Sequence, residues 1–104
     1  MALPALSAEQ RAEALSKAAA TRAARAAAIA KVRNGALTIT DVLDDPESPL
    51  RRAFVRQVLL AVPGIGPARA AQIMTAAGIA PKRRVSGLGG KQAATLKAMA
   101  RALA

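Results

Sequence analysis

The fold is decided by the stretch Val62-Pro63-Gly64-Ile65-Gly66-Pro67-Ala68-Arg69-Ala70, near the middle of a chain of 104 residues. The pattern predicts that one helix ends here, that the chain turns through two glycines, and that a second helix begins. Pro63 ends the first helix, whereas Pro67 suits the first turn of the next one, where a missing amide costs nothing. Gly64 and Gly66 permit positive φ and leave no side chain to block a close approach.

The same turn is a predicted anion site. The backbone amides of the turn and of the helix start point in one direction, and a helix N-terminus carries partial positive charge. We expect Ile65 to point inward and fix the turn, and Arg69 to add a full charge nearby. The segment resembles the hairpin of helix-hairpin-helix DNA-binding modules, which grip phosphates through backbone amides without reading bases. A tight turn with a purely structural role is the alternative.

A second candidate site lies one predicted helix further along, in the stretch Lys82-Arg83-Arg84-Val85-Ser86-Gly87-Leu88-Gly89-Gly90-Lys91-Gln92. Three adjacent cations precede a glycine-rich turn that opens a helix. Arginine can bind phosphate in a bidentate way, and the glycines allow the backbone to approach it. The predicted DNA contacts here are Lys82, Arg83, Arg84, Ser86, Gly87, Gly89 and Lys91. The alternative is a cluster of cations that are simply solvated.

Helices are predicted on both sides of these two sites. Residues 50–62 form one, 67–77 another that stops at Gly78, and 90–102 the last, with a loop over 79–89. Helical spacing places Leu50, Phe54, Val58, Leu59 and Val62 toward a core, and in the last helix Ala94, Leu96, Met99 and Leu103. The first of these helices leaves Arg51, Arg52 and Arg56 on the outside, and Arg52 and Arg56 are further candidate DNA contacts.

The N-terminal third is predicted to be a long alanine-rich helix. Ser7 and Gln10 have the spacing of a capping box, and Asn34-Gly35 is a good stop after Arg33. A short helix follows at 38–43, with Thr38 or Thr40 as its N-cap, and then an acidic loop with two prolines at 44–49. No segment alternates as a strand does. The fold class is therefore all-α, with a helical arm over residues 1–35 and a compact helical core over 36–104.

Basic side chains form a stripe along the predicted arm. At about 100° per residue, Arg11, Arg22, Arg25 and Arg33 fall within a sector about 80° wide. Apolar residues lie on or beside this stripe, so the helix does not divide cleanly into two faces. Two interpretations stay open: a solvated helix with a few anchoring contacts, or an arm that holds DNA phosphates through Arg11, Arg22 and Arg25.

The charge of the chain is unevenly distributed. The formal net charge is +10, from 16 basic and 6 acidic residues. All six acids lie in residues 1–50 and are balanced there by six basic residues, whereas residues 51–104 hold ten basic residues and no acid. Such a field attracts polyanions, while an ordinary solvated surface mixes both signs. This distribution favours nucleic-acid binding.

Composition also argues against several classes of function. Cysteine and histidine are both absent, which removes disulfides, thiolate metal sites, and the commonest general base and metal ligand. A lyase or glycosylase would need an acid beside its nucleophile, yet no acid follows Glu47. No apolar run approaches the roughly 20 residues that span a bilayer, and no signal peptide is recognised. We expect no catalytic residue, cofactor or metal, no membrane contact, and a location in the cytoplasm on the nucleoid.

The chain resembles the actinobacterial integration host factor family over nearly its whole length. The resemblance rests on Met1-Ala2-Leu3-Pro4 with Leu6-Ser7 and Glu9-Gln10-Arg11, on residues 63–74, and on the block from Ile79 through Arg83-Arg84 to Gly89. It implies a long N-terminal helix and a core related to the helix-two-turns-helix fold. It also implies binding of duplex DNA with little sequence preference, with bending or compaction. The β-armed heterodimeric integration host factors share the name but not the fold.

Carried over residue by residue, the resemblance assigns the family's hairpin to Gly64 and Gly66, and its paired arginines to Arg83 and Arg84. Ser86 stands where the family usually has a third arginine. Phe54 stands where a lysine is common, with Arg52 keeping a basic residue two positions earlier. Each missing cation implies one phosphate fewer in contact with the protein, and therefore a salt slope lower by about one.

The resulting hypothesis is a non-catalytic protein that binds double-stranded DNA, bends, bridges or compacts it, and assists site-specific recombination by sharing DNA with a recombinase. We expect a monomer in solution. The alternative is an RNA-binding module similar to a ribosomal protein, since a phosphate grip does not exclude RNA. RNA recognition usually stacks bases on aromatic side chains, and Phe54, the one aromatic residue, is expected to be buried.

Overall fold

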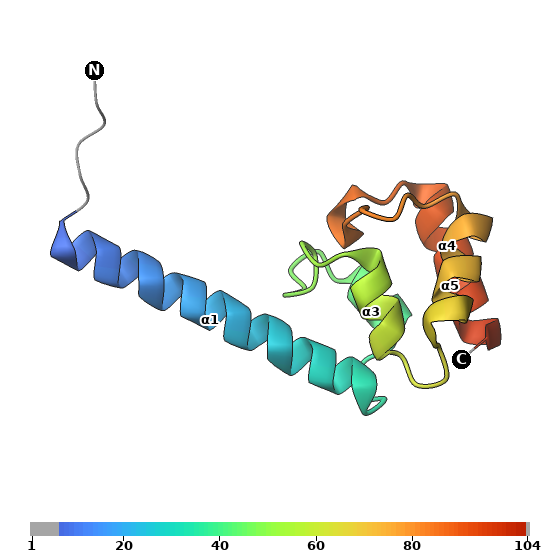
Figure 1. Ribbon diagram of the computed structural model, residues 1–104, viewed down its shortest axis with the longest axis horizontal. Coiled ribbons are helices and arrows are strands. Elements are labelled where there is room, and N and C mark those ends of the chain that lie inside the picture. Colours follow the sequence, from blue (N-terminus) through green and yellow to red (C-terminus); the bar gives the residue numbers. More distant parts are fainter. Residues whose placement is uncertain (1–6, 104) are drawn as a thin grey trace, which may run out of the picture.

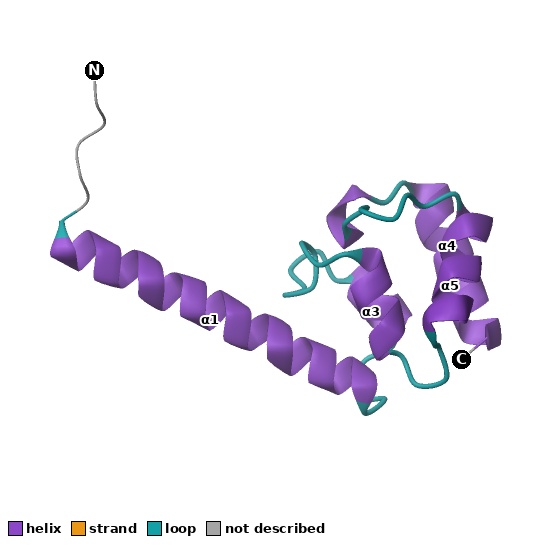
Figure 2. Cartoon of the chain, viewed as in Figure 1, coloured by secondary structure: helices purple, strands orange, loops and turns teal. Residues whose placement is uncertain are grey.

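The computed structural model describes residues 7–103 as helices joined by turns (Figure 1). The elements are α1 (Ala8–Arg33), α2 (Ile39–Asp44), α3 (Val55–Ala61), α4 (Pro67–Ala77), a short 3-10 turn (Val85–Gly87) and α5 (Gly90–Leu103). Figure 2 shows no strand in this part of the chain, and the only pairing of extended backbone there is a single bridge between Phe54 and Arg84. The all-α prediction is confirmed. Residues 1–6, which carry part of the family resemblance, lie outside the described residues.

Helix α1 extends away from the rest of the molecule as an arm (Figure 1). The predicted capping box is present: Gln10 N donates to Ser7 Oγ at 3.1 Å, and Ser7 N donates to Gln10 Oε1 at 2.9 Å. Only Ala28 and Val32, near the C-terminal end, are buried. The Cα radius of gyration is 16.4 Å, against about 13 Å for a compact chain of 100 residues. The arm is therefore held by its last turns alone.

The core is formed by the helices that follow α1, together with its last turns. Helices α3, α4 and α5 pack in sequence order, and α2 packs on α5. The largest fully buried side chains are Leu50, Leu59, Ile73, Leu96, Val32, Val42, Val55 and Val58. Because Val32 belongs to α1 and lies in this cluster, the base of the arm is fixed to the core.

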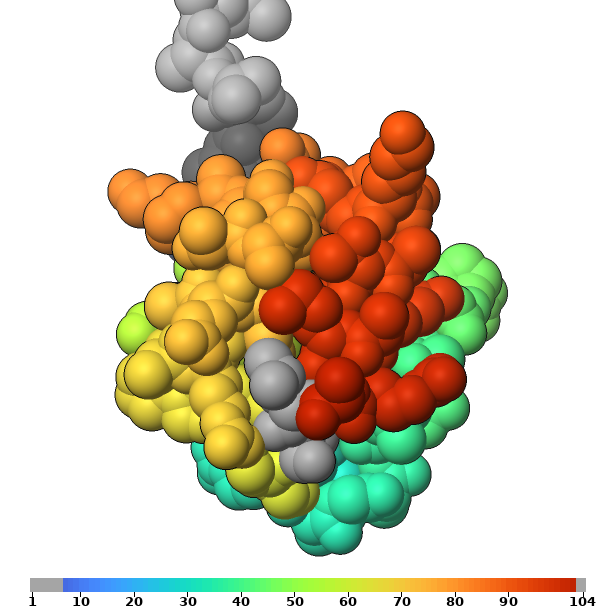
Figure 3. Space-filling view, turned by 90° about the vertical axis from the view of Figure 1, so that its right-hand side faces the viewer, coloured from blue at the N-terminus to red at the C-terminus, as the bar shows by residue number. Residues whose placement is uncertain are grey.

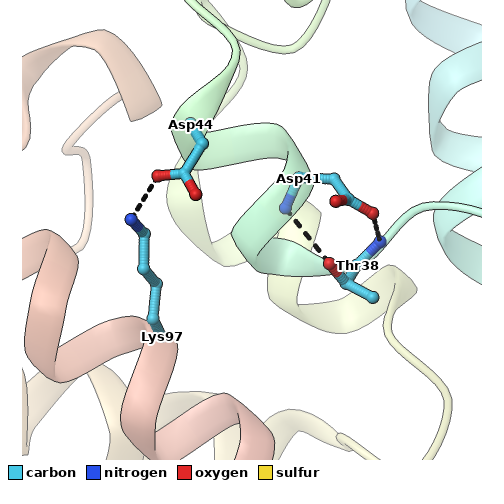
Figure 4. A network of polar contacts seen from close by, with 4 residues as sticks. All are labelled: Thr38, Asp41, Asp44 and Lys97. Carbon is cyan, nitrogen blue, oxygen red and sulfur yellow. Dashed lines mark hydrogen bonds and ion pairs between the residues drawn. The ribbon is translucent and has the colours of Figure 1, made fainter.

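A capping box closes the start of α2, and one ion pair attaches its end to α5 (Figure 4). Thr38, not Thr40, is its N-cap: Asp41 N donates to Thr38 Oγ1 at 3.1 Å, and Thr38 N donates to Asp41 Oδ2 at 2.9 Å. Hydrogen bonding to the Asp41 carboxylate, first from the backbone of Thr38 and then from its side chain, holds the pKa of Asp41 below its ordinary value. At the other end of the helix, Asp44 pairs with Lys97 of α5.

Replacing Thr38 by alanine is expected to lower the free energy of unfolding by about 1 kcal/mol, because the N-cap bond from Asp41 is removed. For a chain of this size that is about 4–8 °C in the melting temperature. Thr40→Ala is the matched control and should have a smaller effect. Asp41 stabilises the fold above its ordinary pKa and ceases to do so as the pH falls through the lowered value. In thermal unfolding from pH 7 to pH 2, the wild-type protein and both variants should therefore all lose stability in acid, because the Thr38 backbone bond to Asp41 is kept in each. Most of the Thr38 difference should remain in acid, because the bond from Asp41 N to Thr38 Oγ1 does not titrate.

The prediction of a helix over residues 50–62 is wrong about where that helix begins. Residues 50–53 form turns, and α3 begins only at Val55. The physical reason is pairing with a distant segment: Val55 N donates to the Arg83 carbonyl at 3.0 Å, and Val85 N to the Ala53 carbonyl at 3.0 Å. The extended backbone also turns Phe54 outward, so the expectation that Phe54 faces the core is wrong; it is 39% exposed.

The first and last residues of α4 and α5 agree closely with the prediction. Gly78 adopts the left-handed conformation that ends α4, with φ 68°. In α5, Leu96 is buried and Met99 packs against the core, but Ala94 is exposed, and Ala100 is buried in its place. The side chain of Leu103 lies outside the described residues. Within residues 7–103, none of the helices has the length and apolar character needed to cross a membrane.

Candidate nucleic-acid interface

The glycine hairpin between α3 and α4 has the geometry that its sequence predicts, with one difference between its glycines. Gly64 has a positive φ of 87°, whereas Gly66 has an ordinary φ of −90° and is the N-cap of α4. Ile65 points inward as expected and is 4% exposed. Arg69 Nη1 donates to the Gly64 carbonyl at 3.0 Å, so this cation closes the turn on itself while remaining exposed. Gly64 is thus required for conformation, and Gly66 leaves the helix start open.

The basic loop, residues 82–91, is held by its own arginines. Arg83 Nη1 donates to the Gly87 carbonyl at 3.0 Å. Arg84 Nη1 donates to the Arg52 carbonyl, and its guanidinium carbon lies 4.5 Å from the centroid of the Phe54 ring. Each guanidinium has five donors, so one bond to a carbonyl positions the group and leaves donors for a phosphate. Both arginines are exposed, as are Lys82 and Lys91.

The hairpin and the basic loop lie at opposite ends of α4 (Figure 1). Figure 3 shows this from the side, with the basic loop at the top of α4 and α5 and the hairpin at the bottom. An 11-residue helix is about 16 Å long, so the two predicted contacts are separated by roughly that distance. They do not form one compact site. A single ligand that touches both must be extended.

Arginines from the arm and from the core meet in a different place, which we call the basic cleft. It is a hollow of about 440 Å³ lined by Thr21, Arg25, Glu47, Ser48, Pro49, Arg51, Arg52 and Ser86. Arg25 is half-buried there, and among the described residues its Nε is a buried donor without a hydrogen-bond partner. Buried donors are nearly always paired, so an unpaired buried Nε is uncommon. The cleft also contains one carboxylate, that of Glu47.

A second hollow lies beside the basic cleft, between the arm and α3, and we call it the helix groove. It measures about 330 Å³ and is lined by Arg22, Arg25, Ala26, Ile29, Ala30, Arg33 and Gln57. Arg25 lines both hollows, so they lie next to each other. Three of the four stripe arginines therefore face the junction of arm and core. Arg11 lies 14 positions before Arg25, about 21 Å along the helix, and is not brought to this junction.

Sequence patterns had missed two features of this surface. Helical spacing predicts only that Arg51 lies on the outside, whereas its place in the basic cleft depends on a turn that replaces the expected helix. Phe54 was expected to be buried, whereas it lines a groove with Arg56, Lys82 and neighbouring apolar residues. No local signal indicates either feature, because both follow from the pairing of residues 51–55 with 83–86. Within residues 7–103, no three His, Cys, Asp or Glu side chains gather as metal ligands would.

Comparison with known proteins identifies the fold of the core and the family of the chain. The family of S13-like H2TH domains matches residues 32–99. Integration host factor of Mycobacterium tuberculosis is 48% identical over 94 residues, which cover 88% of this chain and 90% of the relative. Integration host factor of Streptomyces coelicolor is 40% identical over 99 residues, covering 93% of this chain and 92% of that protein.

Among solved structures, that of sIHF bound to an 8-bp palindromic DNA superposes with a TM-score of 0.73 at 33% identity. The alignment covers 86% of this chain and 99% of that one. The match extends across the arm as well as the core, since the core alone is too short to account for it. The fold of the core, the presence of the arm and the sequence identity all lead to the same family. The chain belongs to the integration host factor family of mycobacteria and Streptomyces.

Proposed function

We propose that this protein binds double-stranded DNA without catalysing a reaction, as a nucleoid-associated protein that bends, bridges or compacts it. The observation that carries the proposal is the basic cleft, where Arg25 from the arm meets Arg51 and Arg52 from the core. The family and the DNA-bound neighbour support duplex DNA as the ligand and do not favour the RNA alternative.

The basic cleft suits a phosphate backbone for a physical reason. Guanidinium groups that converge from two directions can bond several oxygens of one phosphate or of adjacent phosphates. Ser86 supplies a hydroxyl at the same place, and Glu47 limits how closely an anion approaches one wall. Arg22 and Arg33 extend the positive surface along the helix groove. A duplex lying along this junction would touch the arm and the core together.

The glycine hairpin offers a second grip at the far end of α4. It presents the first turn of that helix, with the Arg69 charge beside it. A duplex in the basic cleft reaches the basic loop through Arg84, which is bonded to Arg52. Whether the hairpin holds the same duplex or another one decides between bending and bridging. We propose that the protein is monomeric, acts on the nucleoid, and meets a recombinase only through shared DNA.

The test of duplex specificity is a salt series. Fluorescence anisotropy with a labelled DNA duplex and a matched RNA duplex, over roughly 50 mM to 300 mM salt, is expected to show tighter DNA binding and little sequence preference. Log affinity should fall linearly with log salt, with a slope of about −0.9 per phosphate contact. A duplex of scrambled sequence is the control. Tighter binding of the RNA duplex, or affinity that resists salt, would contradict the proposal.

A further inference from the structure

Phe54 is a large apolar side chain on a strongly basic surface. It is the one aromatic residue of the chain, and it is 39% exposed. Its position is fixed from two sides: the backbone pairs with Arg84, and the Arg84 guanidinium covers the ring at 4.5 Å from its centroid. These two contacts therefore hold the ring at the surface, whereas phenylalanine side chains are more often buried in the core.

The ring borders a hollow of about 460 Å³, which we call the aromatic groove. Its lining is Phe54, Arg56, Gln57, Leu60, Pro81 and Lys82. Arg84, whose guanidinium lies over the ring, is not among the residues that line the groove. The volume lies within the range of small-molecule sites, about 300–1,000 Å³. Gln57 also lines the helix groove, so the aromatic groove adjoins the surface proposed to hold DNA.

The chemistry of this lining matches a nucleotide. Phe54, Leu60 and Pro81 offer an apolar surface on which a base can stack, and Gln57 offers an amide to its edge. Arg56 and Lys82 supply positive charge for the flanking phosphates, and no acid occurs anywhere in residues 51–104. In a continuous duplex every base is stacked between its neighbours, so no base is free to enter. Only an unpaired base can reach the ring.

We infer that the aromatic groove binds an unpaired base of DNA, so that the protein favours duplexes interrupted by a bulge, flap or junction over continuous ones. The inference rests on the proposed function, since Arg25, Arg51 and Arg52 hold the flanking duplex. Base stacking on an aromatic side chain corresponds to about a five- to hundredfold gain in affinity. An acidic peptide or a second protein are the occupants that the test must separate from a base.

The experiment compares three DNA duplexes of one sequence by anisotropy: continuous, with a central one-base bulge, and with an abasic residue at the bulge. The abasic bulge keeps the flexibility of the DNA but removes the stacking partner. The wild-type protein is expected to bind the bulged duplex at least about fivefold tighter than the abasic one. Phe54→Leu and Phe54→Ala should abolish this difference. Any affinity that they lose through the contact between Phe54 and Arg84 should be the same for the bulged and the abasic duplex. Phe54→Tyr should keep the difference.

A second readout reports the base directly. A 2-aminopurine at the bulge should lose fluorescence on binding to the wild-type protein and not to Phe54→Leu. The chain contains no tryptophan or tyrosine to interfere. Equal affinity for base and abasic bulges, or a difference that survives Phe54→Leu, would overturn the inference and leave the groove to a protein partner. Failure to bind the continuous duplex would instead overturn the proposed function, so the two failures are distinct.

Discussion

Replacing Arg25 and Arg52 together by glutamine is expected to weaken binding of duplex DNA by about 60-fold at about 0.1 M salt. Each phosphate contact releases about 0.9 counterion, which contributes about eightfold at 0.1 M relative to 1 M salt. Two contacts multiply to about 60-fold, and the salt slope should become shallower by about two. We expect this large loss of affinity because both side chains line the basic cleft. The measurement is the anisotropy salt series on both proteins.

The matched control removes the same charge from elsewhere on the arm. Lys17 and Lys31 lie on α1 but away from the arginine stripe, and neither lines the basic cleft or the helix groove. Lys17→Gln with Lys31→Gln therefore tests the general attraction of a cationic helix. If both double variants weaken binding equally, the cleft has no special role and only the overall charge matters. Circular dichroism of both variants establishes that the arm stays helical.

Arg25 and Arg52 also show which features the sequence can predict and which it cannot. The caps and breaks could be predicted, because Ser7, Gly35 and Pro67 act on their own neighbours through local geometry. The convergence of Arg25 and Arg52 could not, since it depends on how α1 leans on the turn at 47–52. Sequence patterns proposed a phosphate contact for each of these arginines but assigned the two to separate parts of the molecule.

The error over residues 50–54 has the same origin. Helical spacing of Leu50, Phe54 and Val58 is a real signal, and two of the three are indeed buried. The backbone of this segment bonds instead to residues 83–86, some 30 positions away. Those hydrogen bonds outweigh local helix propensity, which is worth only tenths of a kcal/mol per residue. The exposed Phe54 is a direct consequence, and with it the aromatic groove.

The second large effect concerns the anchor of the glycine hairpin. Ile65→Ala is expected to lower the free energy of unfolding by about 2–5 kcal/mol, because it empties a buried site between α3 and α4. Domains of this size have only about 5–15 kcal/mol in total, so the melting temperature should fall by more than about 10 °C. Unfolding in urea measures the change in the free energy of unfolding. Leu15→Ala, at a side chain that is 68% exposed, is the control and should change stability little.

DNA binding by hairpin variants then separates a phosphate grip from a structural turn. A Cβ added at Gly66 meets nothing within 4 Å and the φ of −90° is ordinary, so Gly66→Ala keeps the fold at a cost below about 1 kcal/mol. If phosphates approach the start of α4, that methyl group stands in their way and affinity falls several-fold with stability nearly unchanged. If affinity is unaffected, the hairpin is only a turn, and DNA is held by the basic cleft and basic loop alone.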